Sequence, residues 1–577
     1  MKTMTLESDR KVSFFNDKYL WTLLAISLSV RIYLSFFTCV IKNDSVAFMQ
    51  IAKYFANGDF LNGLRHDYHP LYSLFIAAVH KVIPNMESSG TIVSVFFGTL
   101  TVIIFYFIGK SVFDHKISFV SAIILAFHPY AVRFSADIIS ESTYFFFFIS
   151  ALGSGYFAIS KKKLHLFALS GICSAFAYLT RPEGIGIIII VAGWCCIKDI
   201  NCVRSIWKDK LASISILAVS FLVFSSPYLI YIKNETGMWL LTKKRNLSQK
   251  NIVTITENPN GDVLINKNTG NSTSGVDTKK KQTAVNKMNT NKISKDVEYK
   301  KPGTEKKTLA NVKLVKKPSK RLSLKTYLES LSYVLTKYIS TFHPFLFIFF
   351  IIGVINWSRI KKAQFFGLYL ASVIAFYLVV LYRLNIVNIA VYNNIYQYPS
   401  RRHLMPIVIP AIICVGIGVY ATGIWVQKKY QSNSMIAGFK ELLKSVWIMQ
   451  LIVLMIVISV LLPKTLKPQR FDKLGIKNAG QWVKGNSHKP SPLIVSTSVR
   501  NAYYAGGGHI QIGNINNTLS LAKEKKVDYI LLTQREYNAI ETELKQSIKN
   551  NKIELAYKYP EEKHLNRHSI FLYKVLY

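Results

Sequence analysis

Long apolar runs separated by short polar connections dominate the chain. A run of roughly 17 to 25 residues with few charges has the length of a helix that crosses a bilayer. About 11 runs, some of them shorter, are expected to span a membrane on this criterion: 20–41, 91–109, 117–132, 141–158, 164–180, 184–198, 211–232, 341–357, 364–383, 402–425 and 444–463. The pattern predicts a polytopic α-helical membrane protein with about 11 transmembrane helices.

The charge of the connections sets the expected orientation. Short cytoplasmic loops carry an excess of Lys and Arg. With a cytoplasmic N-terminus, every short inside connection is basic, through Lys110, Lys116, Lys161, Lys162, Lys163, Lys198, Arg204, Lys208, Lys210, Arg359, Lys361, Lys362, Lys428, Lys429, Lys440 and Lys444. The stretch 71–83 is therefore expected to be a re-entrant or interfacial helix, because a further span there would move every later loop to the other side.

Composition divides the chain into four expected regions. Residues 258–319 are rich in Asn, Thr, Lys and Ser with almost no aromatics, so disorder is expected there. After Pro468, short β-rich runs alternate with helical stretches near 519–526 and 537–549, which predicts a small α/β domain. The β-rich runs are 493–496, 509–512, 529–533 and 569–574. The four regions are an N-terminal membrane core at 1–232, an outside basic loop at 233–340, further transmembrane helices at 341–465 and an extracytoplasmic α/β domain at 466–577.

Net charge alone would suggest a nucleic-acid-binding protein, but its distribution argues against one. The chain has 72 Lys and Arg against 31 Asp and Glu, a formal charge of +41. Of the basic residues, 23 lie between Lys233 and Lys337, and many others flank the apolar runs, where they orient helices. The six cysteines form no CxxC pair, so neither a disulfide framework nor a structural zinc site is supported.

Carboxylates gather on the expected outer face. Asp44 follows the first span, and Asp137 and Glu141 precede the fourth. Because Asp137 and Glu141 are four residues apart, they are expected on one helix face where it enters the bilayer. A carboxylate at membrane depth indicates function unless it is paired. The alternative is that both only favour the helix macrodipole.

Arginines accompany these carboxylates. Arg181 lies in the turn before Glu183, and its forked cation suits a phosphate, although an interfacial arginine reaching out from a helix end is an equal alternative. Arg401 and Arg402 begin the tenth span on the outer side, against the inside bias of basic residues. Arg31 lies inside the first span, where an arginine is unusual; pairing with an acidic residue of the bundle is one possibility, and the sequence names no partner.

Carboxylates and arginines at one outer face suit transfer from a lipid phosphate. Such a leaving group needs cationic stabilisation, and an acceptor hydroxyl needs a base. A soluble nucleotide-sugar enzyme would instead need a Gly-rich phosphate loop, which the sequence lacks.

A series of motifs then resembles a known family, glycosyltransferase family 39. This group contains the dolichyl-phosphate-mannose protein mannosyltransferases and the bacterial aminoarabinose transferases. The motifs are Asn43-Asp44 with Tyr54, His69-Pro70-Leu71-Tyr72, Ser140-Glu141, Leu179-Thr180-Arg181-Pro182-Glu183-Gly184 and Arg402-His403-Leu404-Met405-Pro406. The resemblance covers roughly residues 20 to 465 and implies the GT-C membrane fold.

The resemblance also implies an activity and roles for residues. It implies transfer of a sugar from a polyprenyl-phosphate donor to an extracytoplasmic glycan, lipid or protein, usually with inversion. Asp44 matches the proposed catalytic base, and Glu141 the second acidic position, with Asp137 a further candidate. The expected donor-phosphate or substrate contacts are Arg181, Arg402, Arg401, His69, Tyr72 and Glu183. Ser45 stands where the family often has a second acidic residue, so metal use stays open between none and a divalent ion.

Two other functions remain as alternatives. A transporter or flippase of lipid-linked saccharides would commonly show internal repeats, and no clear repeat is found. A non-catalytic anchor for the C-terminal domain would not need so many spans. The expected location is the plasma (inner) membrane, with a cytoplasmic N-terminus and with membrane lipids, a lipid-linked donor and no nucleic acid as partners.

Overall fold

The computed structural model describes residues 16–198, 206–243, 254–257, 263–266, 322–358, 360, 363–392, 398–431, 445–560 and 568–577. Two compact units divide the chain, one formed by 1–242 with 324–577 and the other by 243–323. In the smaller unit, β1 (Thr254–Glu257) and β2 (Val263–Asn266) pair as an antiparallel hairpin. Apart from β2, the segment 258–319 that was expected to be disordered lies outside the described residues.

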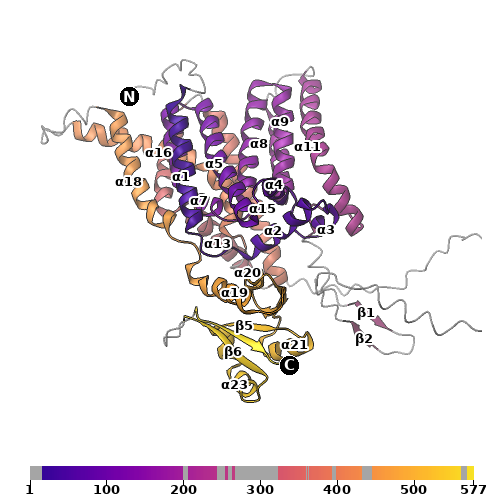
Figure 1. Ribbon diagram of the computed structural model, residues 1–577. Helices are drawn as coiled ribbons and strands as arrows, with labels where there is room; N and C mark the ends of the chain where they lie inside the picture. Colours follow the sequence, from indigo (N-terminus) through magenta and orange to yellow (C-terminus); the bar gives the residue numbers. More distant parts are fainter. Residues whose placement is uncertain are drawn as a thin grey trace, which may run out of the picture. The chain divides into compact units, whose positions relative to one another are not determined.

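A bundle of helices forms most of the larger unit (Figure 1). Its members are α1 (Lys18–Phe36), α5 (Met86–Val112), α6 (His115–Phe127), α7 (Pro129–Ser135), α8 (Glu141–Lys161), α9 (Leu164–Thr180), α10 (Gly186–Ile197), α11 (Ile206–Thr236), α13 (Leu324–Phe342), α14 (Pro344–Trp357), α15 (Gln364–Tyr392), α16 (Arg401–Gln431) and α18 (Val446–Leu466). The helix α13 lies in a part of the chain that the sequence had assigned to the outside loop.

Each expected apolar run contains a helix, but the number of membrane spans depends on how breaks are counted. Seven described helices are long and apolar enough to cross a membrane. Counting the bent pairs α6 with α7 (59°) and α13 with α14 (95°) as one span each gives nine. The two remaining runs form shorter apolar helices, α9 and the 3₁₀ turn η2 (Pro182–Ile185) with α10. The fold is that of a polytopic α-helical membrane protein.

Three short helices follow α1 at one end of the bundle: α2 (Asn43–Ala56), α3 (Phe60–Leu64) and α4 (Leu71–His80). The ten residues of α4 extend about 15 Å, half the thickness of a bilayer core. The helix is too short to span, as expected for the stretch 71–83.

Close packing between α14 and α16 depends on glycine. A Cβ atom on Gly353 would collide with the backbone of Cys414, and one on Gly418 would collide with the backbone of Phe349. Small residues allow helix backbones to approach closely, which is how helices associate in lipid. This contact fixes α16, whose first turn carries Arg402.

A five-stranded sheet organises residues 474–577. Its strand order is β4-β3-β5-β7-β6, with β3 parallel to β4 and β5, and β7 antiparallel to β5 and β6. The elements are α19 (Leu474–Asn486), β3 (Leu493–Ser496), α20 (Val499–Ala505), β4 (Gly508–Gln511), α21 (Thr518–Glu524), β5 (Tyr529–Thr533), α22 (Gln534–Ala539), α23 (Glu541–Lys549), β6 (Ile553–Tyr559) and β7 (Ile570–Val575). Apolar side chains pack on both faces of the sheet.

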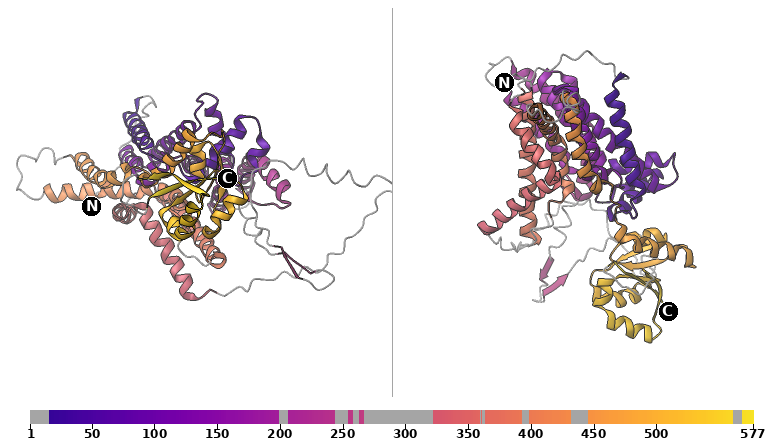
Figure 2. Two further views of the ribbon diagram at one scale, coloured as in Figure 1. Left: turned by 60° about the horizontal axis from the view of Figure 1, so that its bottom comes forward. Right: turned by 90° about the vertical axis from the view of Figure 1, so that its left-hand side faces the viewer.

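The α/β domain lies at the end of the bundle that carries α2, and α20 packs against α2 (Figures 1 and 2). The opposite end carries basic residues of the connections, such as Lys161 at the end of α8. Since α8 has 21 residues, about 30 Å separates its two ends, which matches the thickness of a bilayer core.

Candidate functional site

Ends of four helices meet beside the α/β domain and carry the charged residues that the sequence singled out. Asp44 lies in the first turn of α2, Glu141 begins α8, and Arg402 lies in the first turn of α16. Arg181 ends α9, and Glu183 follows in the 3₁₀ turn. The N-terminus of a helix carries a partial positive charge, so the first-turn carboxylates of α2 and α8 are electrostatically favoured.

These five side chains form a continuous ionic network, here called the Asp44 cluster. The Nη1 of Arg402 lies 2.7 Å from Asp44 Oδ2 and 3.8 Å from Glu141 Oε1. Glu141 also accepts a hydrogen bond from Arg181 Nη1 at 3.0 Å, and Arg181 Nη2 lies 3.4 Å from Glu183 Oε1. The structure thus brings together five residues from distant parts of the sequence.

Exposure differs along the network. The side chains of Asp44 and Arg402 are 28% and 40% exposed, whereas that of Glu141 is 2% exposed. Water and a substrate therefore reach Asp44 and Arg402 more readily than they reach Glu141. A buried carboxylate needs its cations, because removing one partner leaves an uncompensated charge. Glu141 is suited to hold the two arginines in place.

A tyrosine that sequence reasoning did not single out completes the surroundings of Asp44. The hydroxyl of Tyr68 donates to Asp44 Oδ1 at 2.9 Å. Burial, and then the charge of Asp44, raise the pKa of Tyr68, so it stays neutral and donates its proton. In the sequence, the only sign that Tyr68 belongs to the site is its position directly before the His69 motif.

Asp137 belongs to a second, separate group, here called the Asp137 cluster. Its carboxylate accepts from Arg470 Nη1 at 2.9 Å and lies 3.3 Å from Lys42 Nζ. The expectation that Asp137 and Glu141 share one helix face is wrong, because Asp137 lies in the connection between α7 and α8. The break after α7 turns the two carboxylates toward different cations.

Two of the residues expected to contact substrate, His69 and Tyr72, make other contacts. His69 is buried and meets the rings of Tyr178 and Tyr228 with centroid distances of 5.2 and 5.1 Å. The buried hydroxyl of Tyr72 shares a hydrogen bond with Ser94 Oγ at 2.8 Å. These contacts pack α4 against the bundle, and contact of His69 or Tyr72 with substrate stays a prediction.

The adjacent arginines Arg401 and Arg402 point to different neighbours. The guanidinium of Arg401 lies over the ring of Tyr130, 4.9 Å from its centroid, and Lys464 lies over the same ring. Arg402, by contrast, contacts Asp44. Only Arg402 takes part in the Asp44 cluster as described, and a substrate contact for Arg401 stays a prediction.

Arg31 is buried in the bundle, and its described hydrogen bonds are to Ser27. Its Nη1 donates to the carbonyl oxygen and hydroxyl of Ser27 at 3.1 and 2.7 Å. Among the described residues it makes no ion pair, and its side chain packs near Gly98. Of the possibilities left open by the sequence, the described residues show hydrogen bonds to Ser27 and no carboxylate partner.

The described residues contain no group of three or more His, Cys, Asp or Glu side chains that could bind a metal ion. In the Asp44 cluster, guanidinium groups stand between the carboxylates. The choice between no metal and a divalent ion stays open.

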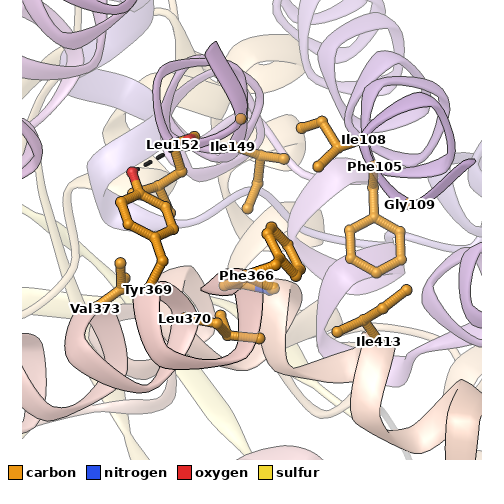
Figure 3. Close-up of a pocket in the computed structure, with 12 residues that line it drawn as sticks. Phe105, Ile108, Gly109, Ile149, Leu152, Phe366, Tyr369, Leu370, Val373 and Ile413 are labelled. Carbon is orange, nitrogen blue, oxygen red and sulfur yellow. Dashed lines mark hydrogen bonds between the residues drawn. The ribbon is translucent and has the colours of Figure 1, made fainter. Parts of the chain in front are cut away.

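An apolar pocket lies deeper in the bundle, between α5, α8, α15 and α16 (Figure 3). Leu152, Tyr369, Leu370 and Ile413 are among the residues that line it, and the Tyr369 hydroxyl donates to the Leu152 carbonyl at 3.1 Å. Its free volume is about 30 Å³, which holds at most a few water molecules. The pocket is too small to receive a substrate in this conformation.

Comparison with known proteins identifies one matching family. The sequence model of the family described as dolichyl-phosphate-mannose-protein mannosyltransferase matches residues 67–231. The match includes Glu141, Arg181 and Glu183 and leaves out Asp44 and Arg402. No curated protein matches the chain in sequence.

Solved structures extend the likeness to nearly the whole chain. ArnT from Cupriavidus metallidurans bound to undecaprenyl phosphate is 10% identical with a TM-score of 0.52, and the match covers 96% of this chain and 97% of that one. Its apo state gives 10% identity, a TM-score of 0.51 and the same coverage. The oligosaccharyltransferase AglB from Archaeoglobus fulgidus, in complex with an inhibitory peptide and a dolichol-phosphate, is 10% identical with a TM-score of 0.47, covering 90% and 70%.

The family match and the fold agree with the resemblance found in the motifs. The matched segment contains the His69, Glu141 and Arg181 motifs, and ArnT has the same overall fold. These findings support the resemblance to glycosyltransferase family 39: the chain has the fold of ArnT, and its residues 67–231 match the sequence model described as dolichyl-phosphate-mannose-protein mannosyltransferase.

Proposed function

We propose that this protein transfers a sugar from a polyprenyl-phosphate donor to an acceptor hydroxyl at the outer face of the plasma membrane. One observation carries the proposal: a partly exposed carboxylate, Asp44, lies within 2.7 Å of a partly exposed guanidinium, that of Arg402. Group transfer from a lipid phosphate needs these two groups, a base for the acceptor and a cation for the leaving group. A relative in fold, ArnT, has been solved with undecaprenyl phosphate bound.

Asp44 is the proposed general base. The acceptor oxygen attacks the anomeric carbon, Asp44 takes the hydroxyl proton, and the bond from the anomeric carbon to the phosphate oxygen breaks. Tyr68 donates to the other carboxylate oxygen and so helps to orient the group. With attack from the face opposite the phosphate, the anomeric configuration inverts.

Arg402 and Arg181 are the proposed contacts of the donor phosphate. Both contact Glu141, which sets their spacing. Glu183 keeps Arg181 oriented through its own ion pair.

Orientation follows from the two ends of the bundle. The Lys-rich connections lie at the end opposite the Asp44 cluster, and such connections stay in the cytoplasm. We therefore place the N-terminus inside, and the Asp44 cluster and the α/β domain outside, where lipid-linked saccharides can be acceptors or donors. The sugar and the acceptor, whether glycan, lipid or protein, are left to experiment.

The decisive experiment measures radiolabelled sugar transfer from a panel of synthetic polyprenyl-phosphate sugars in membranes that contain the native chain or Asp44→Asn. Removal of a general base is expected to lower transfer at least about 100-fold. The matched control is Glu541→Gln, which removes an exposed carboxylate on α23 and should leave transfer unchanged. Equal amounts of both variants in the membrane must be verified.

Two outcomes would contradict the proposal. Full turnover by Asp44→Asn would exclude Asp44 as the base. Labelling equal to empty membranes across a broad panel of donors and acceptors, together with exchange of lipid-linked saccharide between leaflets, would indicate a flippase instead.

A further inference from the structure

The segment 37–43, which leads from α1 to Asp44, makes several hydrogen bonds with residues far along the chain. Gln469 pairs with it as a short parallel bridge: its N–H donates to the Phe37 carbonyl at 2.9 Å, and its carbonyl accepts from the Cys39 N–H at 3.1 Å. The amide of the buried Gln469 side chain also donates to Thr38 Oγ1 at 3.1 Å. One residue of the connection after α18 thus fixes the first half of the segment.

The α/β domain fixes the second half. The N–H of Ile41 donates to the Tyr504 hydroxyl at 3.0 Å, and Ser498 Oγ donates to Asn43 Oδ1 at 3.1 Å. Both contacts come from α20 and the residue before it (Figure 1). Asn43 directly precedes Asp44, so the last contact lies one residue from the proposed base.

The Asp137 cluster adds an ionic link between the same parts. Arg470 has a left-handed backbone with φ of 54°, which turns its side chain back toward the segment. Its Nε donates to the Val40 carbonyl while its Nη1 holds Asp137. Lys42, from the segment itself, contacts the same carboxylate, which is 1% exposed. Asp137 therefore joins the segment to residue 470 and to the start of α8.

The geometry points to a positioning role: we propose that Gln469, Arg470, Ser498 and Tyr504 hold Asp44 in place, so that the α/β domain completes the active site instead of serving as a separate module. The inference rests on the proposed function of Asp44. The backbone of 37–43 forms hydrogen bonds with four residues of the C-terminal part of the chain, which are Gln469, Arg470, Lys477 and Tyr504.

Positioning of this kind acts on turnover. A displacement of about 1 Å in a reacting group can cost about 100-fold in rate. Donor binding depends on Arg402 and Arg181, which none of these four residues contacts through an ion pair in the described part of the chain. Loosening of 37–43 should thus lower kcat and leave the donor KM nearly unchanged.

The test uses the full-length double variant Ser498→Ala/Tyr504→Phe, which removes two hydroxyl groups and no charge. Its kcat is expected to fall about tenfold with an unchanged donor KM. Tyr529→Phe is the matched control, because it removes a hydroxyl from the same domain, on β5, away from 37–43. It should transfer sugar at the native rate.

Cys39 supplies an independent readout of the segment. The residue lies within 37–43 and is partly exposed. Its rate of modification by a membrane-impermeant maleimide, followed by peptide-resolved mass spectrometry, should rise severalfold in the double variant and stay native in Tyr529→Phe.

The two readouts separate the possible failures. Native kcat in the double variant overturns the positioning role, whether or not Cys39 becomes more reactive. A fall in kcat with native Cys39 reactivity also overturns it, since the segment would then be undisturbed. Absence of transfer by the native chain would instead contradict the proposed function, while Cys39 would still report whether α20 holds the segment.

Discussion

Two charged clusters lie side by side where the bundle meets the α/β domain, and they differ in their exposure to solvent. Ser45 Oγ, next to Asp44, donates to the carbonyl of Ile138, next to Asp137, at 2.7 Å. Asp44 is 28% exposed and faces an arginine that is itself 40% exposed. Asp137 is 1% exposed and is held by Arg470 and Lys42.

This difference in exposure indicates different roles for the two carboxylates, Asp137 and Asp44. A buried carboxylate with two fixed cations is costly to move, because either partner lost leaves an uncompensated charge. An accessible carboxylate with one exposed cation can exchange that partner for a substrate group at lower cost. Proximity in space therefore does not make Asp137 equivalent to Asp44, although both carry the same chemical group at the same end of the bundle.

The largest expected effect lies in the exposed cluster, in the variant Arg402→Ala. Loss of the cation that meets the leaving phosphate should lower kcat/KM about 100-fold or more, typical of a removed electrostatic donor. Arg402→Lys keeps the charge and loses the forked geometry, so it should recover only part of the rate. Transfer assays on both variants check this, and a native rate for Arg402→Ala would remove the distinction between the clusters.

An intermediate effect is expected in the buried cluster, in the variant Arg470→Ala. It should lower kcat about tenfold and the free energy of unfolding by about 1 to 3 kcal/mol, because Asp137 loses a buried charged partner. Thermal unfolding in detergent and transfer kinetics measure the two effects. In the double variant Asp137→Asn/Arg470→Ala, part of the lost stability should return, since the buried charge is gone.

The outcome for Arg470→Ala sharpens the comparison. Native transfer by Arg470→Ala, together with the expected loss of stability, would show that the buried cluster contributes to stability alone.

The smallest expected effect concerns pH and His509 on β4. Burial lowers the pKa of His509 below its ordinary value of 6.5, while the hydrogen bond with the Ser496 carbonyl opposes the shift. The unfolded chain then binds a proton more readily, so stability is lost as the pH falls below about 6.5. His509→Gln should reduce the decrease in melting temperature between pH 7.5 and 5.5 by about 2 °C. An unchanged decrease would place the pH sensitivity elsewhere.

Sequence predicted the helices far better than the contacts between them. The apolar runs became helices because membrane length and low charge are local properties, and four of the five strands of the α/β domain were expected from short β-rich runs. The strand β6 was missed, since it carries charged residues such as Glu554 and Lys558.

The candidate site shows where local patterns fail. Asp44, Glu141 and Arg181 each stood in a recognisable motif, and the structure joins them with Arg402 in one network. The partners Tyr68 and Arg470 could not be predicted, because no local pattern shows which distant backbone a side chain will meet. The expected shared face of Asp137 and Glu141 failed because the helix starts only at Glu141.

The bridge between Thr38 and Gln469 has a consequence for the biogenesis of the protein. Asp44 leaves the ribosome 425 residues before Gln469, an interval of about 20 to 85 s at ordinary rates of synthesis. Throughout that time the nascent first loop lacks its partners. On the proposed role of Asp44, the base would be held in position only after the final segment has been translated and has docked, so that transfer activity would require complete assembly.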